Sequence, residues 1–142
     1  MMHRLRYSLL ALVMFGLAVL PGHAQTKSHR VLFALTSGDQ MDWEMTIHNI
    51  NNLIKGLAPD NVEVEVVAYG PGISFLKKDS VAAADIAKLE EEHVHFMACN
   101  NAMRAAHLTQ VDLVPGAVVV PAGIVEVVTK EEEGWTYIKA GR

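Results

Sequence analysis

Residues 93–103 read HVHFMAC and then NNAM, and this stretch decides the fold. Seven mostly apolar residues have the length of a buried strand, whereas the segment that begins at Asn100 is typical of a helix start. The sequence therefore predicts that a strand ends at Cys99 and passes directly into a helix. Cys99 is the single cysteine of the chain, and the free amides of a helix N-terminus favour a thiolate in that position.

The same alternation of strand-length and helix-length segments continues on both sides of this junction. Strands are predicted over residues 30–36, 62–69, 93–99, 117–120 and 135–139. The segment 62–69 begins with alternating Val and Glu, which predicts a partly exposed first half. Continuously apolar strands separated by helix-length crossovers predict one α/β domain, a doubly wound, mostly parallel five-stranded sheet with helices on both faces.

Four helices are expected between these strands. Asp39 is expected to cap the first, in which Trp43, Ile47, Ile50, Ile54 and Leu57 recur at helical spacing, and Ser80 is expected to cap the second. The third runs from Asn100 to Ala106, and the fourth carries Ile124, Val127 and Val128 on one face before Gly134 stops it. A short helical turn is expected around residues 73–78, and a turn resembling a capping box over 109–112.

The first 24 residues have the pattern of a cleaved export signal. Arg4 and Arg6 precede an uncharged run at 9–20, and small residues follow up to Ala24. The run is too short to span a membrane, which takes roughly 20 apolar residues. We therefore expect a periplasmic protein, cleaved near Ala24, whose single domain covers residues 25–142.

Charge excludes some partners of this domain. Residues 25–142 contain 10 Lys and Arg against 16 Asp and Glu, a formal charge of −6. Nucleic acid and anionic membrane surfaces are therefore not expected partners.

Ligands of doubly wound folds collect at the carboxyl ends of the strands. Three predicted loops lie there, namely Ser37-Gly38-Asp39, Gly70-Pro71-Gly72 and Cys99-Asn100-Asn101. None of them has a phosphate-binding glycine pattern, so no nucleotide or flavin cofactor is expected.

A lone cysteine in an exported chain is a buried apolar residue, an intermolecular link or a reactive thiol. A cysteine hydrolase also needs a base and an orienting group, and the sequence identifies neither. His93, His95, Met97 and Cys99 lie on one side of the strand, which raises a metal site. Positions spaced about 7 Å apart along a strand converge poorly on one ion. His93 is instead expected at the exposed strand entry and His95 as a hydrogen-bonded interior residue, so no metal site is assigned.

Three segments resemble the DsrE/DsrF-like family: FMACNNAM at 96–103, LTQVDLVPG at 108–116 and VVPAG at 119–123. The resemblance covers the chain from Arg30 onward. It implies a single α/β domain that assembles into dimers, trimers or hexamers. In the sulfur-relay members a lone cysteine accepts and passes on sulfur as a persulfide, and Cys99 is the matching residue. The resemblance implies no metal or organic cofactor.

These observations lead to one hypothesis and two alternatives. The hypothesis is an exported, oligomeric sulfur carrier or sulfurtransferase that exchanges sulfane sulfur through Cys99 with donor and acceptor proteins or small sulfur compounds. One alternative is a non-catalytic ligand-binding or assembly module with an inert cysteine. The other is a metal-binding protein that uses His95, Met97 and Cys99.

Overall fold

The computed structural model describes residues 27–142. The predicted export signal and its cleavage position near Ala24 lie outside the described residues. Five strands form one sheet in the order β4-β3-β2-β1-β5, and every neighbouring pair is parallel. The strands are β1 (Ser28–Leu35), β2 (Asn61–Ala68), β3 (Val94–Cys99), β4 (Val118–Val120) and β5 (Thr136–Ala140). The predicted doubly wound α/β fold is confirmed.

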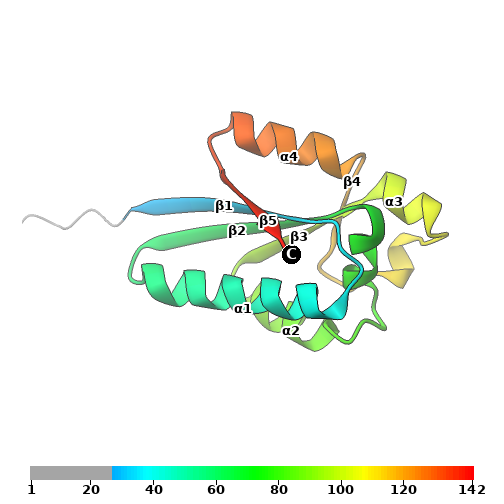
Figure 1. The fold of residues 1–142 in the computed structure, drawn as a ribbon, viewed down its shortest axis with the longest axis horizontal. Helices are drawn as coiled ribbons and strands as arrows, with labels where there is room; N and C mark the ends of the chain where they lie inside the picture. Colours follow the sequence, from blue (N-terminus) through cyan, green and yellow to red (C-terminus); the bar gives the residue numbers. More distant parts are fainter. Residues whose placement is uncertain (1–26) are drawn as a thin grey trace, which may run out of the picture.

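Helices lie on both faces of this sheet, but unequally. They are α1 (Gln40–Leu57), α2 (Ala83–Glu91), α3 (Asn100–Ala105) and α4 (Gly123–Glu132), with the 3-10 helices η1 (Gly70–Leu76) and η2 (Gln110–Asp112). Figure 1 shows α1 and α2 together below the sheet, whereas α4 lies alone above it. One face therefore has far more helical cover than the other.

Local capping explains where two of these helices begin. Asp39 caps α1 as predicted, because its side chain accepts a hydrogen bond from the Met41 amide at 2.9 Å. Ser80 does not cap α2. Its hydroxyl accepts from the amide of Ala82 at 3.2 Å, which holds a turn, and α2 starts three residues later than Ser80. The capping box of Thr109 and Asp112 is confirmed.

Strand alternation divides the core into two clusters. Val31, Phe33 and Leu35 of β1 point into the large cluster under α1 and α2. Leu32 and Ala34 point to the opposite face, where the buried cluster comprises only Leu32, Ala34, Val67, Val127 and Trp135. The face under α4 thus contributes the smaller part of the apolar core.

The orientation of α4 differs from the sequence prediction. Only Gly123 and Val127 of this helix are buried, and Ile124 and Val128, predicted on the same face as Val127, are exposed. The sheet-facing side also includes half-buried Glu126 and Lys130. On this side of the helix Lys130 pairs with Glu65, a buried residue of β2.

Candidate functional site at the junction of β3 and α3

Cys99 lies at the predicted strand-to-helix junction. It is the last residue of β3 and the N-cap of α3. Its side chain is buried, because the residue retains only 5% of its accessible surface. A reagent therefore reaches this sulfur only through a narrow opening or after a local movement.

The first residue of α4 packs over Cys99. A Cβ placed on Gly123 would lie 3.2 Å from the Cβ of Cys99 and 2.7 Å from the Cβ of Tyr69. Contacts under 3.0 Å are not tolerated without movement, so only glycine fits at this position. Gly123 and Tyr69 are therefore the immediate neighbours of the cysteine on the α4 side of the sheet.

Two helices begin beside the cysteine. The N-cap of α3 is Cys99 itself, the N-cap of α4 is Ala122, and neither end has a side-chain cap. The amides in the first turn of a helix carry partial positive charge. This arrangement places partial positive charge where the two helix starts meet.

The two asparagines after Cys99 do not enclose the sulfur. Asn100 is half-buried, and Asn101 is exposed and accepts a hydrogen bond from Arg104 one turn later. Their observed contribution is to start α3 at the predicted place.

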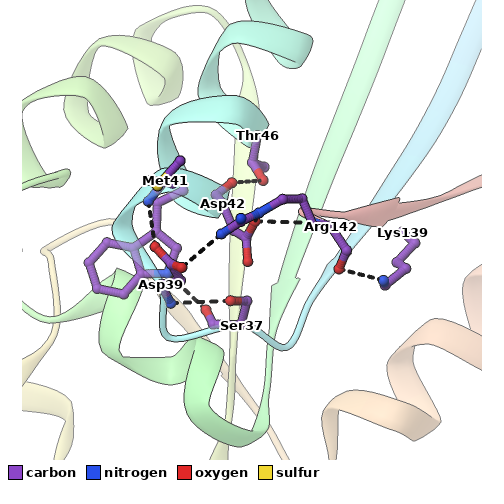
Figure 2. A network of polar contacts seen from close by, with 8 residues as sticks. Ser37, Asp39, Met41, Asp42, Thr46, Lys139 and Arg142 are labelled. Carbon is purple, nitrogen blue, oxygen red and sulfur yellow. Dashed lines mark hydrogen bonds and ion pairs between the residues drawn. The ribbon is translucent and has the colours of Figure 1, made fainter.

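The predicted pocket loop Ser37-Gly38-Asp39 contacts other parts of the same chain, namely Arg142 and Trp43. Figure 2 shows Arg142 between Asp39 and Asp42, with nitrogen-to-oxygen distances of 2.8 Å and 3.0 Å. The Ser37 carbonyl accepts a hydrogen bond from the indole of Trp43 at 2.8 Å. Hydrogen bonding with Ser37 and then with Arg142 lowers the pKa of Asp42. The polar groups of this loop therefore hold the start of α1.

The second predicted loop, Gly70-Pro71-Gly72, packs against the first. The Gly72 amide donates to the Thr36 carbonyl at 3.0 Å, and a Cβ on Gly72 would lie 2.2 Å from the Leu35 carbonyl oxygen. A Cβ on Gly38 would lie 3.4 Å from Pro71. Gly72 is thus required by close backbone packing.

A shallow, mainly apolar cavity of about 340 Å³ lies between η1 and α3. Its lining residues are Gly70, Pro71, Ile73, Ser74, Ala102, Ala105 and Ala106. Cys99 is not among them. The structure therefore brings the Gly70-Pro71 turn next to the helix that follows the cysteine, while the Cys99 Cβ packs toward α4.

The two histidines that most closely precede Cys99 in the sequence are both exposed. His93 is exposed with a φ of 65°, before the strand begins. His95 is also exposed, contrary to the prediction of an interior residue. Among residues 27–142, no three His, Cys, Asp or Glu side chains are grouped to hold a metal ion. None of the helices in this range is long and apolar enough to cross a membrane.

Sequence reasoning missed a buried ion pair under α4. The Nζ atom of Lys130 lies 3.1 Å from Oε2 of Glu65 and 4.7 Å from the ring centroid of Trp135. Glu65 is only 2% exposed, and both its Oε1 atom and the Trp135 indole nitrogen are buried without a hydrogen-bond partner. The pair lies between α4 and the sheet at the end of the helix opposite to Cys99.

Burial and pairing act in opposite directions on these two groups. Burial raises the pKa of Glu65 to about 6, even though the hydrogen bond and the charge of Lys130 oppose this change. Burial is the largest single effect on Lys130 and lowers its pKa, but the hydrogen bond and charge of Glu65 together with the charges of Glu126 and Glu133 outweigh it, so the net change is upward. The alternation of residues 62–65 suggested an exposed Glu65. Glu65 is buried because α4 returns over that face of the sheet. No local sequence pattern indicates this return.

The all-parallel sheet and the lone cysteine at the β3–α3 junction define an α/β domain with a single cysteine. The comparison with protein families identifies which family this domain belongs to. The model of the DsrE/DsrF-like family matches residues 25–140, and the chain belongs to this family. The search of curated proteins gave no match.

A solved structure shares this fold. The protein of unknown function MTH1491 from Methanobacterium thermoautotrophicum is 36% identical, with a TM-score of 0.75. The match covers 78% of this chain and 98% of that chain. This similarity supports the fold and the family.

Proposed function

We propose that this protein binds or transfers sulfane sulfur through Cys99. The observation that carries the proposal is a solitary thiol at the meeting point of two uncapped helix starts. Membership of a family related to sulfur-relay proteins supports it. The helix ends supply the positive potential that a thiolate and a bound persulfide both need.

The transfer is ordinary sulfur exchange. The Cys99 thiolate attacks the outer sulfur of a donor persulfide, the sulfur–sulfur bond of the donor breaks, and the donor thiolate leaves. With thiosulfate the leaving group is sulfite. An acceptor thiolate then attacks the outer sulfur on Cys99, and the Cys99 thiolate leaves. Each step moves one sulfur atom between thiolates, so it requires no metal or organic cofactor.

The burial of Cys99 favours a second candidate function. A thiol that is only 5% exposed also suits an inert core residue in a ligand-binding or assembly module. The two functions differ in whether small sulfur compounds reach the sulfur in the folded protein.

Intact mass spectrometry of the folded protein after incubation with polysulfide or thiosulfate tests the proposal. We expect an adduct of about 32 Da that a reducing thiol removes. The Cys99→Ser variant should fold and carry no adduct. Equal loading of the variant, or no loading of the native protein under conditions that load a small free thiol, would support the inert module instead.

We further propose a homo-oligomer, in which a second copy packs on the outer surface of α4. Ile124, Val125 and Val128 are exposed there, and Val118 at the edge of the sheet is also exposed. A helix with charged residues toward the sheet and apolar residues toward solvent fits an interface between subunits.

Light scattering measures this assembly directly. We expect residues 25–142 to form a dimer, trimer or hexamer that Val125→Lys breaks, whereas Val81→Lys, at an equally exposed position next to α2, leaves the mass unchanged. A monomeric native protein contradicts the assembly proposal.

The proposed periplasmic location has its own test. The mature protein recovered from a periplasmic fraction should have an N-terminus near Gln25. Recovery of the full-length chain in the cytoplasmic fraction alone contradicts it.

A further inference from the structure

Three features of α4 connect its position to the cysteine. Its first residue, Gly123, packs over Cys99 and Tyr69. Its sheet-facing side buries only Gly123 and Val127, so few apolar contacts hold it down. Its last turn is joined to β2 by the ion pair of Lys130 with Glu65.

We propose that α4 is a lid over Cys99 and that the charge on Glu65 controls how readily this lid opens. Its role as a regulator of sulfur exchange rests on the function proposed above, whereas the coupling between Glu65 and the exposure of Cys99 does not. The movement is a displacement of a packed helix from the sheet, of the kind seen in shear motions.

The surroundings of Glu65 show why its charge matters. Lys130 contacts one carboxylate oxygen, and the other oxygen has no partner. The other charged or titratable groups on this face are Glu63 on β2, Tyr69 just after it, Arg30 on β1, His95 on β3, Tyr137 and Lys139 on β5 and Glu126 on α4, with Glu133 following α4. Lys139 donates to the Arg142 carbonyl. Arg30 is already engaged, because it lies over the Trp135 ring and donates to the Glu133 carbonyl. A charged Glu65 is therefore buried with a single cation, and lifting α4 returns it to water.

The direction of the effect follows from linkage. Burial under α4 raises the pKa of Glu65 from its ordinary 4.5 to about 6. The proton therefore binds more tightly in the closed form and favours closure, whereas loss of the proton above about pH 6 favours opening. The difference between these two pKa values allows the open population to rise by up to about 30-fold between acid and neutral pH.

The test measures how fast Cys99 reacts with a dipyridyl disulfide, a thiol reagent that also works at acid pH, in the native protein and in Glu65→Gln. Glutamine resembles the protonated glutamate in shape and charge. Dividing the native rate by the variant rate cancels the ionisation of the thiol itself. We expect a ratio near one at pH 4.5 that rises with a midpoint near pH 6, by up to about 30-fold. A ratio that is flat over this range overturns the proposal.

Three controls make the result specific. Glu63→Gln removes an exposed carboxylate from the same strand and face. The native rate divided by the rate of this variant should not change with pH. Lys130→Gln removes the single cation at Glu65. We expect the pH midpoint of the Cys99 reaction in this variant to lie above that of the native protein. An unchanged midpoint contradicts the proposal, and this comparison holds even if Glu65→Gln fails to fold. Light scattering at each pH should give a constant mass, because a mass change with the same midpoint would assign the effect to assembly and overturn the lid.

This result is independent of sulfur loading. Failure to form the persulfide adduct leaves the pH-dependent ratio intact, and a flat ratio leaves the persulfide proposal standing.

Discussion

The two faces of the sheet are built differently. The face under α1 and α2 contains the large apolar cluster, with three phenylalanines buried among aliphatic side chains. The face under α4 has a cluster of five buried residues, a buried ion pair and the cysteine, which also contacts the core of the first face. The comparison teaches that the first face supplies most of the apolar core, whereas the second combines few buried apolar residues with a buried ion pair.

The largest expected effect compares two leucines on β1. Leu35 and Leu32 are both fully buried but point to opposite faces. Replacement of a buried leucine by alanine costs roughly 2–5 kcal/mol, depending on how far the site collapses. We expect Leu35→Ala near the upper end and Leu32→Ala near the lower end, measured by urea unfolding, because α4 settles into the space more easily than two packed helices do. Equal losses would remove the energetic distinction between the faces.

The next effect concerns the contact between α4 and Cys99. Gly123→Ala places a methyl group against Tyr69, and overpacking of this kind costs about 1–3 kcal/mol. We expect lower stability and faster reaction of Cys99 in the same variant. The matched control is Gly56→Ala in α1, where a Cβ meets nothing within 4 Å and the helix should gain a few tenths of a kcal/mol up to about 1. Unchanged thiol reactivity in Gly123→Ala would show that α4 does not limit access.

A smaller effect separates the faces by pH. The folded-state pKa of Glu65 is raised to about 6, so its protonated form stabilises the fold below pH 4.5, and this contribution is lost as the pH rises through 6. The loss amounts to about 2 kcal/mol. Urea midpoints of the native protein should therefore fall relative to those of Glu65→Gln between pH 4.5 and 7. Parallel profiles would contradict the burial of a charged carboxylate under α4.

The smallest effect is expected at the Arg142 network. Arg142→Ala removes ion pairs with Asp39 and Asp42, but the arginine is mostly exposed and such pairs contribute little. We expect a slightly lower thermal midpoint at low salt and a smaller difference at high salt, because salt screens exposed charges. The control Lys88→Ala breaks an exposed pair with Asp85 on α2 and should behave similarly. A large, salt-independent loss would mean that this network stabilises the fold as strongly as the core does.

Hydrophobic pattern was enough to predict the fold class and most element positions. The segments that became β1, β2 and β3 are apolar and short, and α1 repeats its buried residues at helical spacing between Asp39 and Pro59. The junction at Cys99 was predictable for the same reason, because a strand pattern there stops directly before a helix pattern. Such signals depend on local sequence, so they can be read without knowing which distant segments pack against each element.

What could not be predicted depends on contacts between distant segments. Glu65 is buried because α4 returns over β2, whereas His95, its partner in the register of β3, stays exposed. Asp39 of the Ser37–Asp39 loop pairs with Arg142, which is about a hundred residues away in sequence. Whether Cys99 carries sulfur stays a prediction, because fold and family alone do not determine it.

The missing side chain at Gly123 has a consequence for cargo. A persulfide adds to Cys99 a sulfur atom of about the size of a methyl group, and on the α4 side Gly123 lies so close to Tyr69 and Cys99 that no Cβ fits on it. Cargo on the sulfur and a fully seated α4 therefore compete for volume. Sulfur bound to Cys99 would then be detectable from the other end of α4. Trp135 lies beneath that end of the helix, and its fluorescence reports a displacement there.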